Sequence, residues 1–397
     1  MRVCLLTGGG DTPYALGLLN ALVARDIKVD FIANDEMSRA DVAMNENVNC
    51  LNLRGDQSPS ASKIGKFARV LKYYSRLITY SLTSEATIFH ILWFNKFLLF
   101  DRTVLNMYYK CLGKKLVFTA HNVDETERDG RSNFFVKMSL KILYHLVDHV
   151  FVHTSKMRSQ LIHDYKVDEA RATVIPFGIN NTIPKSGISR EEARAKLHLQ
   201  SHEKVLLFFG LIAPYKGLEY LLYALDQLRK TDPAIKLIIV GQVKDCQSYW
   251  RNIESIIENL QLHANLIRRI EYVPDKDVEA IFRSADVLIL PYRFIYQSGV
   301  LFLSYSFGLP VIATDVGSLR DDIQEGITGM VCKAEDANDL ARTIREYFEG
   351  DLYKNLEERM KYIVAHGNEK YSWDRVGSAT HHVYQALLPK NESGVTH

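Results

Sequence analysis

One lysine stands where the surrounding pattern could bind a phosphate. Residues 205–209 are apolar and predict a short strand that ends at Gly210, and the loop after it carries Lys216. A helix then begins at Gly217, because leucines recur at helical spacing over residues 218–228. Ammonium groups and helix N-termini both favour anions, and ligands of open α/β sheets lie at the carboxyl ends of strands. The pattern therefore predicts a phosphate or diphosphate site, with a solvated surface lysine as the alternative.

A second anion site is predicted after the strand at residues 287–290. The following loop contains Arg293 and leads into an apolar helix that begins at Ser298 and Gly299. Free backbone N–H groups in the first turn of that helix can hold a phosphate. The guanidinium of Arg293 can donate two parallel hydrogen bonds to a phosphate, or it can be an ordinary surface arginine.

Two further candidates lie in the first half of the chain. Gly9 and Gly10 follow the strand at residues 2–6, and consecutive glycines let backbone N–H groups approach a ligand closely. Their spacing is not GxGxxG, which argues against a dinucleotide such as NAD, and a simple tight turn explains them equally well. His121 follows the strand at residues 116–120 and can exchange hydrogen bonds with a bound group. A core histidine bonded to the backbone is the alternative.

Composition and charge exclude several classes of protein. The chain has 397 residues and a net charge of +2, so we expect two domains and no nucleic-acid partner. Its five cysteines are scattered, with neither CxxC spacing nor a disulfide framework, which fits a cytoplasmic protein. No apolar run reaches the roughly 18 residues of a spanning helix. Asp275 and Asp277 could hold Mg²⁺, but they lie where a helix should begin, and we expect no metal and no cofactor.

Short apolar segments alternate with helical patterns along the whole chain, which predicts an α/β fold with parallel sheets covered on both faces. We therefore expect two Rossmann-like domains facing across a cleft. A polar, turn-rich stretch at residues 180–187 is the expected linker, so the first domain spans 1–183 and the second 184–370. The expected strands are 2–6, 28–33, 87–92, 116–120, 149–153, 172–175, 205–209, 236–240, 270–273, 287–290 and 311–314.

Residues 57–117 are strongly basic, with ten lysines and arginines against Glu85 and Asp101. Apolar residues are interleaved with the cations as a stripe at helical spacing. A basic amphipathic stretch in a nearly neutral protein suggests contact with an anionic membrane surface. The alternative is a helix whose apolar face packs on its own domain. The cations are Lys63, Lys66, Arg69, Lys72, Arg76, Lys96, Arg102, Lys110, Lys114 and Lys115, and the stripe is Ile64, Phe67, Val70, Leu71 and Tyr74.

In this order and at these spacings, the motifs resemble those of the retaining GT-B-fold glycosyltransferases of family 4, also called group 1. The resemblance runs from the first strand to about Leu388. It implies the GT-B architecture, with the nucleotide-sugar donor held mainly by the second domain, the acceptor on the side of the first, and a final helical segment at 371–390 that crosses back onto the first domain. The motifs are Gly8-Gly9-Gly10, Ala120-His121-Asn122, Val174-Ile175-Pro176-Phe177-Gly178-Ile179, Phe209-Gly210 to Lys216-Gly217, Ile239-Val240-Gly241, Ser284-Ala285-Asp286-Val287, Gly308-Leu309-Pro310-Val311-Ile312-Ala313-Thr314 and Tyr371-Ser372-Trp373.

The resemblance also implies roles for individual residues. Lys216 matches the lysine that neutralises the donor diphosphate, and His121 matches the histidine that reaches the donor sugar or the reacting centre. Two departures are visible: Leu211 stands where the family usually has an arginine, and the two glutamates of its Glu-x7-Glu pair fall on Ile295 and Leu303. Arg293 is expected to replace the missing arginine. The expected catalytic residues are His121, Lys216 and Arg293, and the expected donor-binding residues are Gly9, Gly10, Gly210, Lys216, Gln297, Ser298, Gly299 and Val300.

The predicted function is transfer of a sugar from a nucleotide-diphosphate donor to a hydroxyl acceptor, a glycan or a lipid-linked saccharide, with retention of configuration. The expected setting is surface polysaccharide biosynthesis in the cytoplasm, with peripheral contact to the inner face of the cell membrane. Because the family's glutamates are missing, a nucleotide-sugar-binding protein with weak or no catalysis is the alternative. A second alternative is an NAD-dependent enzyme, against which the absence of GxGxxG argues.

Overall fold

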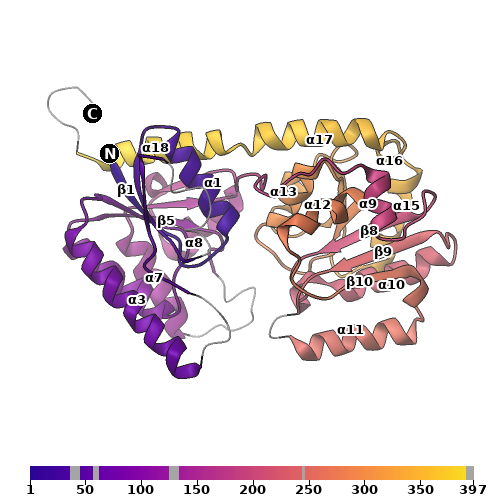
Figure 1. Cartoon of the computed structure of the whole chain (residues 1–397), viewed down its shortest axis with the longest axis horizontal. Helices are drawn as coiled ribbons and strands as arrows, with labels where there is room; N and C mark the ends of the chain where they lie inside the picture. The colour runs from indigo at the N-terminus through magenta and orange to yellow at the C-terminus, as the bar shows by residue number, and fades with distance from the viewer. Residues whose placement is uncertain (36–44, 57–61, 125–133, 244–245, 390–397) are drawn as a thin grey trace. The chain divides into compact units, whose positions relative to one another are not determined.

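The structure, a computed structural model, describes residues 1–35, 45–56, 62–124, 134–243 and 246–389. The chain divides into two compact units, and the boundaries fall after Gly178 and after Tyr371 (Figure 1). Residues 1–178 and the C-terminal residues from Ser372 form the first unit, and residues 179–371 form the second. The polar stretch at residues 180–187 thus belongs to the second unit.

The first unit is built on a seven-stranded parallel sheet of order β3-β2-β1-β4-β5-β6-β7. Four of its strands, β1, β4, β5 and β6, are nearly continuous apolar runs, as expected for a sheet covered by helices on both faces. The strands are β1 (Arg2–Leu6), β2 (Lys28–Ile32), β3 (Val48–Leu51), β4 (Ile88–Ile91), β5 (Lys115–Ala120), β6 (His149–Val152) and β7 (Ala172–Val174). The helices are α1 (Thr12–Val23), α3 (Lys63–Thr83), α4 (Leu98–Phe100), the π-helical turn η2 (Asp101–Leu105), α5 (Asn106–Cys111), α7 (Phe134–Leu146), α8 (Ser155–Tyr165), η3 (Glu169–Arg171) and α18 (Trp373–Leu387).

The second unit repeats the plan with a six-stranded parallel sheet of order β10-β9-β8-β11-β12-β13. Its strands are β8 (Lys204–Phe209), β9 (Ile235–Val240), β10 (Leu266–Arg269), β11 (Val287–Leu290), β12 (Val311–Thr314) and β13 (Gly329–Cys332). Its helices are α9 (Arg190–Lys196), η4 (Pro214–Lys216), α10 (Leu218–Arg229), α11 (Gln247–Asn259), η5 (His263–Asn265), α12 (Asp275–Ser284), α13 (Gly299–Phe307), α14 (Leu319–Asp322), α15 (Ala337–Glu349), α16 (Asp351–Lys354) and α17 (Leu356–Lys370).

Both sheets have the strand order of a Rossmann fold, so the predicted α/β class and the two Rossmann-like domains are confirmed. In each sheet the order reverses beside the first strand, between β1 and β4 in the first and between β8 and β11 in the second. Loops that follow these strands diverge at the reversal and leave room for a ligand at the carboxyl ends. The glycine loop follows β1, whereas Lys216 follows β8 and Ser298 follows β11.

One expected strand was wrong, and two strands were missed. The strand expected at 270–273 lies at β10, four residues earlier, and residues 270–273 form the loop after it. β10 pairs only with β9, and an edge strand tolerates the arginines that obscured it in the sequence. The missed strands β3 and β13 are also edges. Each of these strands has only four residues, and the two middle residues of each are not fully buried.

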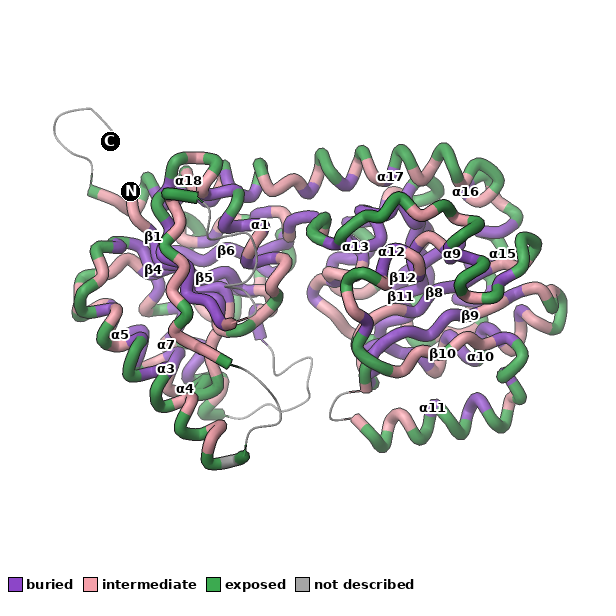
Figure 2. The backbone as a smooth tube through the Cα atoms, viewed as in Figure 1, coloured by how far each residue is buried: buried purple, intermediate pink, exposed green. Residues whose placement is uncertain are grey.

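The sheets form the two cores, which appear in purple in Figure 2. In the first unit α18 packs on α1, and the indole of Trp373 lies against Gly17, where a Cβ atom would overlap it. The last helix of the chain therefore completes the core of the first unit. Among the helices that the structure describes, none is both long enough and apolar enough to cross a membrane.

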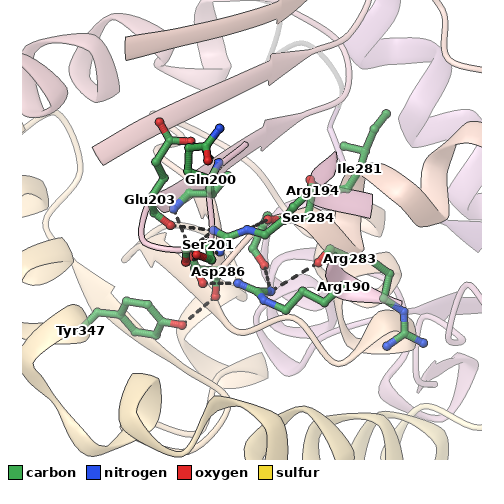
Figure 3. A network of polar contacts seen from close by, with 12 residues as sticks. Arg190, Arg194, Gln200, Ser201, Glu203, Ile281, Arg283, Ser284, Asp286 and Tyr347 are labelled. Carbon is green, nitrogen blue, oxygen red and sulfur yellow. Dashed lines mark hydrogen bonds and ion pairs between the residues drawn. The ribbon is translucent and has the colours of Figure 1, made fainter. Parts of the chain in front are cut away.

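The Asp286 motif has a structural role at the amino ends of two central strands of the second sheet, β8 and β11 (Figure 3). The carboxylate of Asp286 pairs with Arg190 and Arg194 and accepts a hydrogen bond of 2.6 Å from the backbone N–H of Val205. The hydroxyl of Tyr347 donates to its carbonyl at 2.7 Å. These bonds tie α9 and α15 to the first residues of β8 and β11, so the motif fixes the sheet rather than a ligand.

Candidate functional site

Lys216 is held in the interior of the second unit by the turn that precedes α10. The residue ends η4, and its side chain is buried, with only 6% of its surface exposed. Its ammonium group donates a hydrogen bond of 2.8 Å to the hydroxyl of Tyr292 and lies 4.6 Å from the centre of the same ring. A buried ammonium costs free energy unless an anion or dipoles compensate it, so this placement favours an anion-binding role over that of a solvated lysine.

The N-terminus of α13 meets Lys216 through Tyr292. The Tyr292 hydroxyl lies 3.3 Å from the Oγ atom of Ser298, the residue before the first turn of α13. Ser298 is itself buried and its side chain makes no capping bond to the helix. Lys216 and Ser298 come from the loops after β8 and β11, the two strands at which the strand order reverses. The structure therefore brings the two predicted anion sites together.

Two glycines make this convergence possible. A Cβ atom on Gly210 would lie 3.4 Å from the ammonium nitrogen of Lys216 and 3.4 Å from a methyl group of Val300. Gly210 therefore lies beside Val300, which follows the expected donor-binding residues Ser298 and Gly299 in the chain. Gly217 has a φ of +63° and packs against the backbone carbonyl of Pro291, where a Cβ atom would overlap it. That close approach sets the first turn of α10 beside the loop that contains Tyr292.

The electrostatics of this cluster are dominated by one positive charge. Burial raises the pKa of Tyr292, so its phenol stays neutral and does not neutralise the ammonium of Lys216. The N-terminal dipole of α13 adds partial positive charge from backbone N–H groups. A lysine, a neutral phenol and a helix N-terminus together form an anion site of the kind that a diphosphate fits.

Arg293 follows Tyr292 in the same loop, and its backbone N–H donates to the carbonyl of Tyr215 at 2.8 Å. Its Nε atom donates to Glu335 at 3.1 Å, and its guanidinium also lies 3.9 Å from Glu219. The guanidinium that the sequence pattern predicts to bind a phosphate is therefore paired with two carboxylates. The catalytic role of Arg293 stays a prediction.

Gln297 offers one free acceptor. Its amide nitrogen donates to Asp322 at 3.3 Å, while its Oε1 atom is buried without a hydrogen-bond partner in the part of the chain that the structure describes. Asp322 is fixed in turn by Ser318 at 3.1 Å and by the hydroxyl of Tyr371 at 2.9 Å. An oriented amide oxygen can accept from a sugar or ribose hydroxyl, as expected for a neutral substitute of a glutamate.

The positions of the missing family residues remain apolar in the fold. Leu303 is buried within α13, and Leu211 lies partly exposed in the loop after β8. Neither can provide the charge that a glutamate or an arginine would. The chemistry at these positions therefore differs from the family pattern.

In the first unit, His121 belongs to a cluster of aromatic rings at the carboxyl ends of β5 and β6. The imidazole stacks on the indole of Trp93 at 4.3 Å with an interplanar angle of 6°. The ring of Tyr14 meets it edge-on at 4.7 Å, and Phe177 does so at 5.9 Å. Its Nδ1 atom lies 3.0 Å from Nε2 of His153, which is buried. Burial, with smaller contributions from His153 and His90, lowers the pKa of His121 well below its usual value.

The glycine loop is a tight turn shaped by its neighbours. Gly8 and Gly9 have φ angles of +57° and +75°, which favour glycine, and a Cβ atom on Gly10 would overlap the indole of Trp93. The guanidinium of Arg54 lies over Gly9, about where its Cβ atom would be, and donates to Asn95 at 3.1 Å. The loop therefore lies beside Trp93 and a cation that the sequence pattern did not single out.

His90 is a core residue. Its two ring nitrogens bond to the Tyr384 hydroxyl at 2.6 Å and the Thr119 hydroxyl at 2.7 Å, and the side chain is fully buried. Both nitrogens are satisfied, so His90 is not available to a ligand. Sequence reasoning also missed Tyr14, His153 and Tyr292, because only their partners in the fold distinguish them from other buried residues.

The fold and the two clusters define a two-domain α/β protein of the GT-B type, and comparison with known proteins gives the family. Residues 8–182 match the family model described as Glycosyltransferase Family 4, and residues 189–365 match that of Glycosyl transferases group 1. Together the two matches span most of the chain. The chain belongs to the group 1 glycosyltransferases.

Individual relatives are distant. The chain is 28% identical over 284 residues to D-inositol 3-phosphate glycosyltransferase of Nocardia farcinica, covering 69% of this chain and 61% of the relative. The chain thus spans less than two thirds of that relative's length. Among solved structures, sucrose-phosphate synthase of Thermosynechococcus elongatus has a TM-score of 0.76 at 19% identity and covers 98% of this chain and 99% of its own. HepE of Anabaena in complex with UDP-glucose has a TM-score of 0.73 at 15% identity, covering 98% and 100%. At these identities the solved structures show a shared fold.

Proposed function

We propose that this protein transfers a sugar from a nucleotide-diphosphate donor to a hydroxyl group of a glycan or lipid-linked saccharide, with retention of the anomeric configuration. One observation carries the proposal: the buried ammonium of Lys216 and the N-terminus of α13 converge through Tyr292 where the strand order of the second sheet reverses. A diphosphate between a sugar and a nucleoside would place its negative charge there. The nucleotide-sugar ligand of HepE, which shares the fold, supports this ligand class.

The proposed chemistry is departure and attack on one face of the sugar. The bond between the anomeric carbon and the diphosphate breaks, and its electron pair leaves with the diphosphate. The acceptor oxygen then bonds to the same face of that carbon, and the hydroxyl proton passes to the departing diphosphate. Because negative charge develops on the diphosphate, fixed positive groups accelerate this step most. Lys216 and the backbone N–H groups of Gly299 and Val300 supply that stabilisation in the proposal without a metal ion.

The remaining residues receive supporting roles. Gln297 would accept from a donor hydroxyl through its free Oε1 atom. His121 would contact the sugar near the reacting centre, and the loop of Gly9 and Gly10 would contact donor and acceptor through its backbone. The proposed setting remains the biosynthesis of surface polysaccharide.

A binding and turnover panel tests the proposal. Thermal shifts with UDP-, GDP- and ADP-sugars, each compared with its free nucleoside diphosphate and with NAD, identify the donor, because a ligand of the folded state raises Tm. Donor hydrolysis and transfer to saccharide acceptors then test catalysis, with the product anomer determined by NMR. We expect a shift for one nucleotide family, turnover without added divalent metal, and retention. A stable complex without turnover would favour the alternative, a nucleotide-sugar-binding protein, and an inverted product would refute the retaining mechanism.

We further propose that an exposed apolar face of the first unit contacts an anionic membrane. The first turns of α3 expose Ile64, of which 83% is accessible, and this face continues over α4, η2, α5 and the start of α7. Tyr74 of α3 stacks on Phe97 at 5.6 Å, which joins α3 to α4. The exposed apolar side chains are Ile64, Phe67, Leu71, Phe97, Leu98, Leu99, Val104, Met107, Phe134, Phe135 and Met138.

The cations of this region are fewer at the surface than the sequence suggests. Arg102 is buried over the ring of Phe94, and Lys110 and Lys115 both pair with Asp148. Residues 57–61 of the basic segment lie outside the described residues. Exposed cations do remain on the same elements, namely Lys72 and Arg76 on α3, Lys96 before α4, and Lys137 and Lys141 on α7. Apolar side chains bordered by lysine and arginine suit an anionic interface.

Co-sedimentation with phosphatidylglycerol and phosphatidylcholine vesicles tests the membrane proposal. We expect the protein to pellet with the anionic vesicles at low salt, and the double variant Leu98→Ser with Leu99→Ser to lose this binding. Tyr223→Ser, which removes an exposed apolar side chain from the second unit, is the matched control and should bind as wild type. A wild-type protein that stays in solution with anionic vesicles would refute membrane contact.

A further inference from the structure

We infer that His153 is a positioning residue that fixes His121 as the neutral tautomer with its proton on Nδ1, so that Nε2 presents a lone pair to a sugar hydroxyl. This inference rests on the proposed function for its ligand. The hydrogen-bond chain itself stands on contacts within the first unit. It begins at a backbone carbonyl and ends at His121.

The first link sets the direction of the chain. The Nδ1 atom of His153 lies 3.4 Å from the carbonyl oxygen of Ile175. A carbonyl oxygen can only accept, so this nitrogen must carry a proton and donate it. His153 has only 6% of its surface exposed, and burial lowers its pKa to about 4, so the ring is neutral near pH 7. A neutral imidazole has one proton, and the Nε2 atom of His153 is therefore an acceptor.

The second link transmits that polarity to His121. The Nε2 atom of His153 lies 3.0 Å from Nδ1 of His121. Because the first is an acceptor, the second must be the donor. The other tautomer of His121 would set two lone pairs against each other and leave a buried N–H group unpaired, which is unfavourable.

The third feature is the free end of the chain. The Nε2 atom of His121 is buried and has no hydrogen-bond partner within the ranges that the structure describes. The rings of Trp93 and Tyr14 hold the imidazole by stacking and edge contacts, and neither contact carries a charge. An uncharged acceptor held in this way suits a hydroxyl group and disfavours a phosphate oxygen, which also has only lone pairs to offer. In this arrangement His121 binds a sugar hydroxyl and does not neutralise the diphosphate.

The tautomer can be measured without substrate. The 397-residue chain is labelled with ¹⁵N-histidine, and long-range ¹H–¹⁵N correlation spectra at neutral pH distinguish protonated from bare ring nitrogens. The chain has 13 histidines, and the spectrum of His121→Asn identifies the signals of His121. We expect Nδ1 of His121 to be protonated and Nε2 to be bare. A proton on Nε2 in the wild-type protein would overturn the inference.

Two variants of His153 test its role. His153→Leu removes the acceptor, so we expect His121 to exchange between both tautomers, whereas His153→Gln keeps an acceptor at that end and should restore the Nδ1–H form. An unchanged His121 tautomer in His153→Leu would overturn the inference. With UDP-glucose as the probed donor, kcat/KM should fall about tenfold in His153→Leu, the size of one hydrogen bond, and recover in His153→Gln. A wild-type protein without any turnover would contradict the proposed function alone, since the tautomer spectra decide the role of His153 by themselves.

Discussion

Replacing Lys216 by methionine tests the diphosphate site most directly. Methionine keeps an unbranched apolar stem beside Tyr292 and removes the charge together with its hydrogen bond to the Tyr292 hydroxyl. At about 4 Å and an effective dielectric constant of about 20, one charge pair contributes about 4 kcal/mol. Part of this is offset because the helix N-terminus also stabilises the phosphate, so we expect a loss of about 3 kcal/mol, similar to the removal of one oxyanion donor. That loss corresponds to about a hundredfold weaker binding of the nucleoside diphosphate.

The stability of the same variant separates a ligand-binding role from a structural one. A buried ammonium is costly, and its hydrogen bond of 2.8 Å to Tyr292 offsets part of that cost. Lys216→Met should therefore change the free energy of unfolding by less than about 1 kcal/mol, or raise it. Urea denaturation measures this change. Destabilisation of several kcal/mol would show that the lysine mainly holds the fold.

Calorimetry with two matched ligands completes the test. The nucleoside diphosphate chosen by the thermal-shift panel is compared with its nucleoside, which has no phosphate. Lys216→Met should weaken only the diphosphate. Lys230→Met removes an exposed lysine paired with Asp226 at 2.6 Å and should bind both ligands as wild type. The reasoning is refuted if both ligands weaken in parallel, or if diphosphate binding is unchanged.

Three further predictions use the same two units. Tyr292→Phe removes only the hydroxyl that orients Lys216, so calorimetry should show nucleoside diphosphate binding weakened by about 1 kcal/mol and nucleoside binding unchanged; equal weakening of both would contradict the orienting role. Gly217→Ala adds a Cβ atom that overlaps the Pro291 carbonyl, whereas Gly326→Ala, at a φ of +72°, meets no atom within 4 Å. In thermal melts Gly326→Ala should cost only the strain of a left-handed conformation, about 1–2 kcal/mol, and Gly217→Ala clearly more, and equal costs would contradict the packing argument. Burial lowers the pKa of His90 to about 3, so below pH ~6.5 the unfolded chain takes up a proton that the folded protein does not, and the free energy of unfolding should fall by up to about 1.4 kcal/mol per pH unit down to about pH 3. Denaturation curves from pH 7 to 4 should show a shallower fall in His90→Gln, and an identical slope would refute the assignment.

Local patterns predicted most of the fold. Strands such as β1, β8 and β11 are nearly continuous apolar runs. Their alternation with helical patterns along the chain is enough to predict two parallel sheets. Three of the four edge strands in the described sheets, β3, β10 and β13, escaped detection, because a strand with a neighbour on one side only does not need an apolar sequence; the fourth, β7, was predicted at 172–175.

The candidate site was predicted in part. Lys216 and Ser298 were identified because each follows a strand and precedes a helix, which sequence spacing reveals. Tyr292, which links them, has no such signal, since any buried tyrosine after a strand would look the same. The charge excess of residues 57–117 overstates the number of cations available at the surface, because the partners of Arg102 and Lys110 are visible only in the fold.

The sequence by itself determined the class of fold, the two strand–loop–helix positions for anions and the departures at Leu211, Ile295 and Leu303, because these depend on residues close together in the chain. Only the tertiary structure decided which charges are available. It paired Arg293 with Glu219 and Glu335, buried the ammonium of Lys216 against Tyr292, and placed His153 against His121. The physical reason is that burial and partners set the strength of a charge or a lone pair, and the partners in these pairs lie from 32 to 76 residues apart in the sequence.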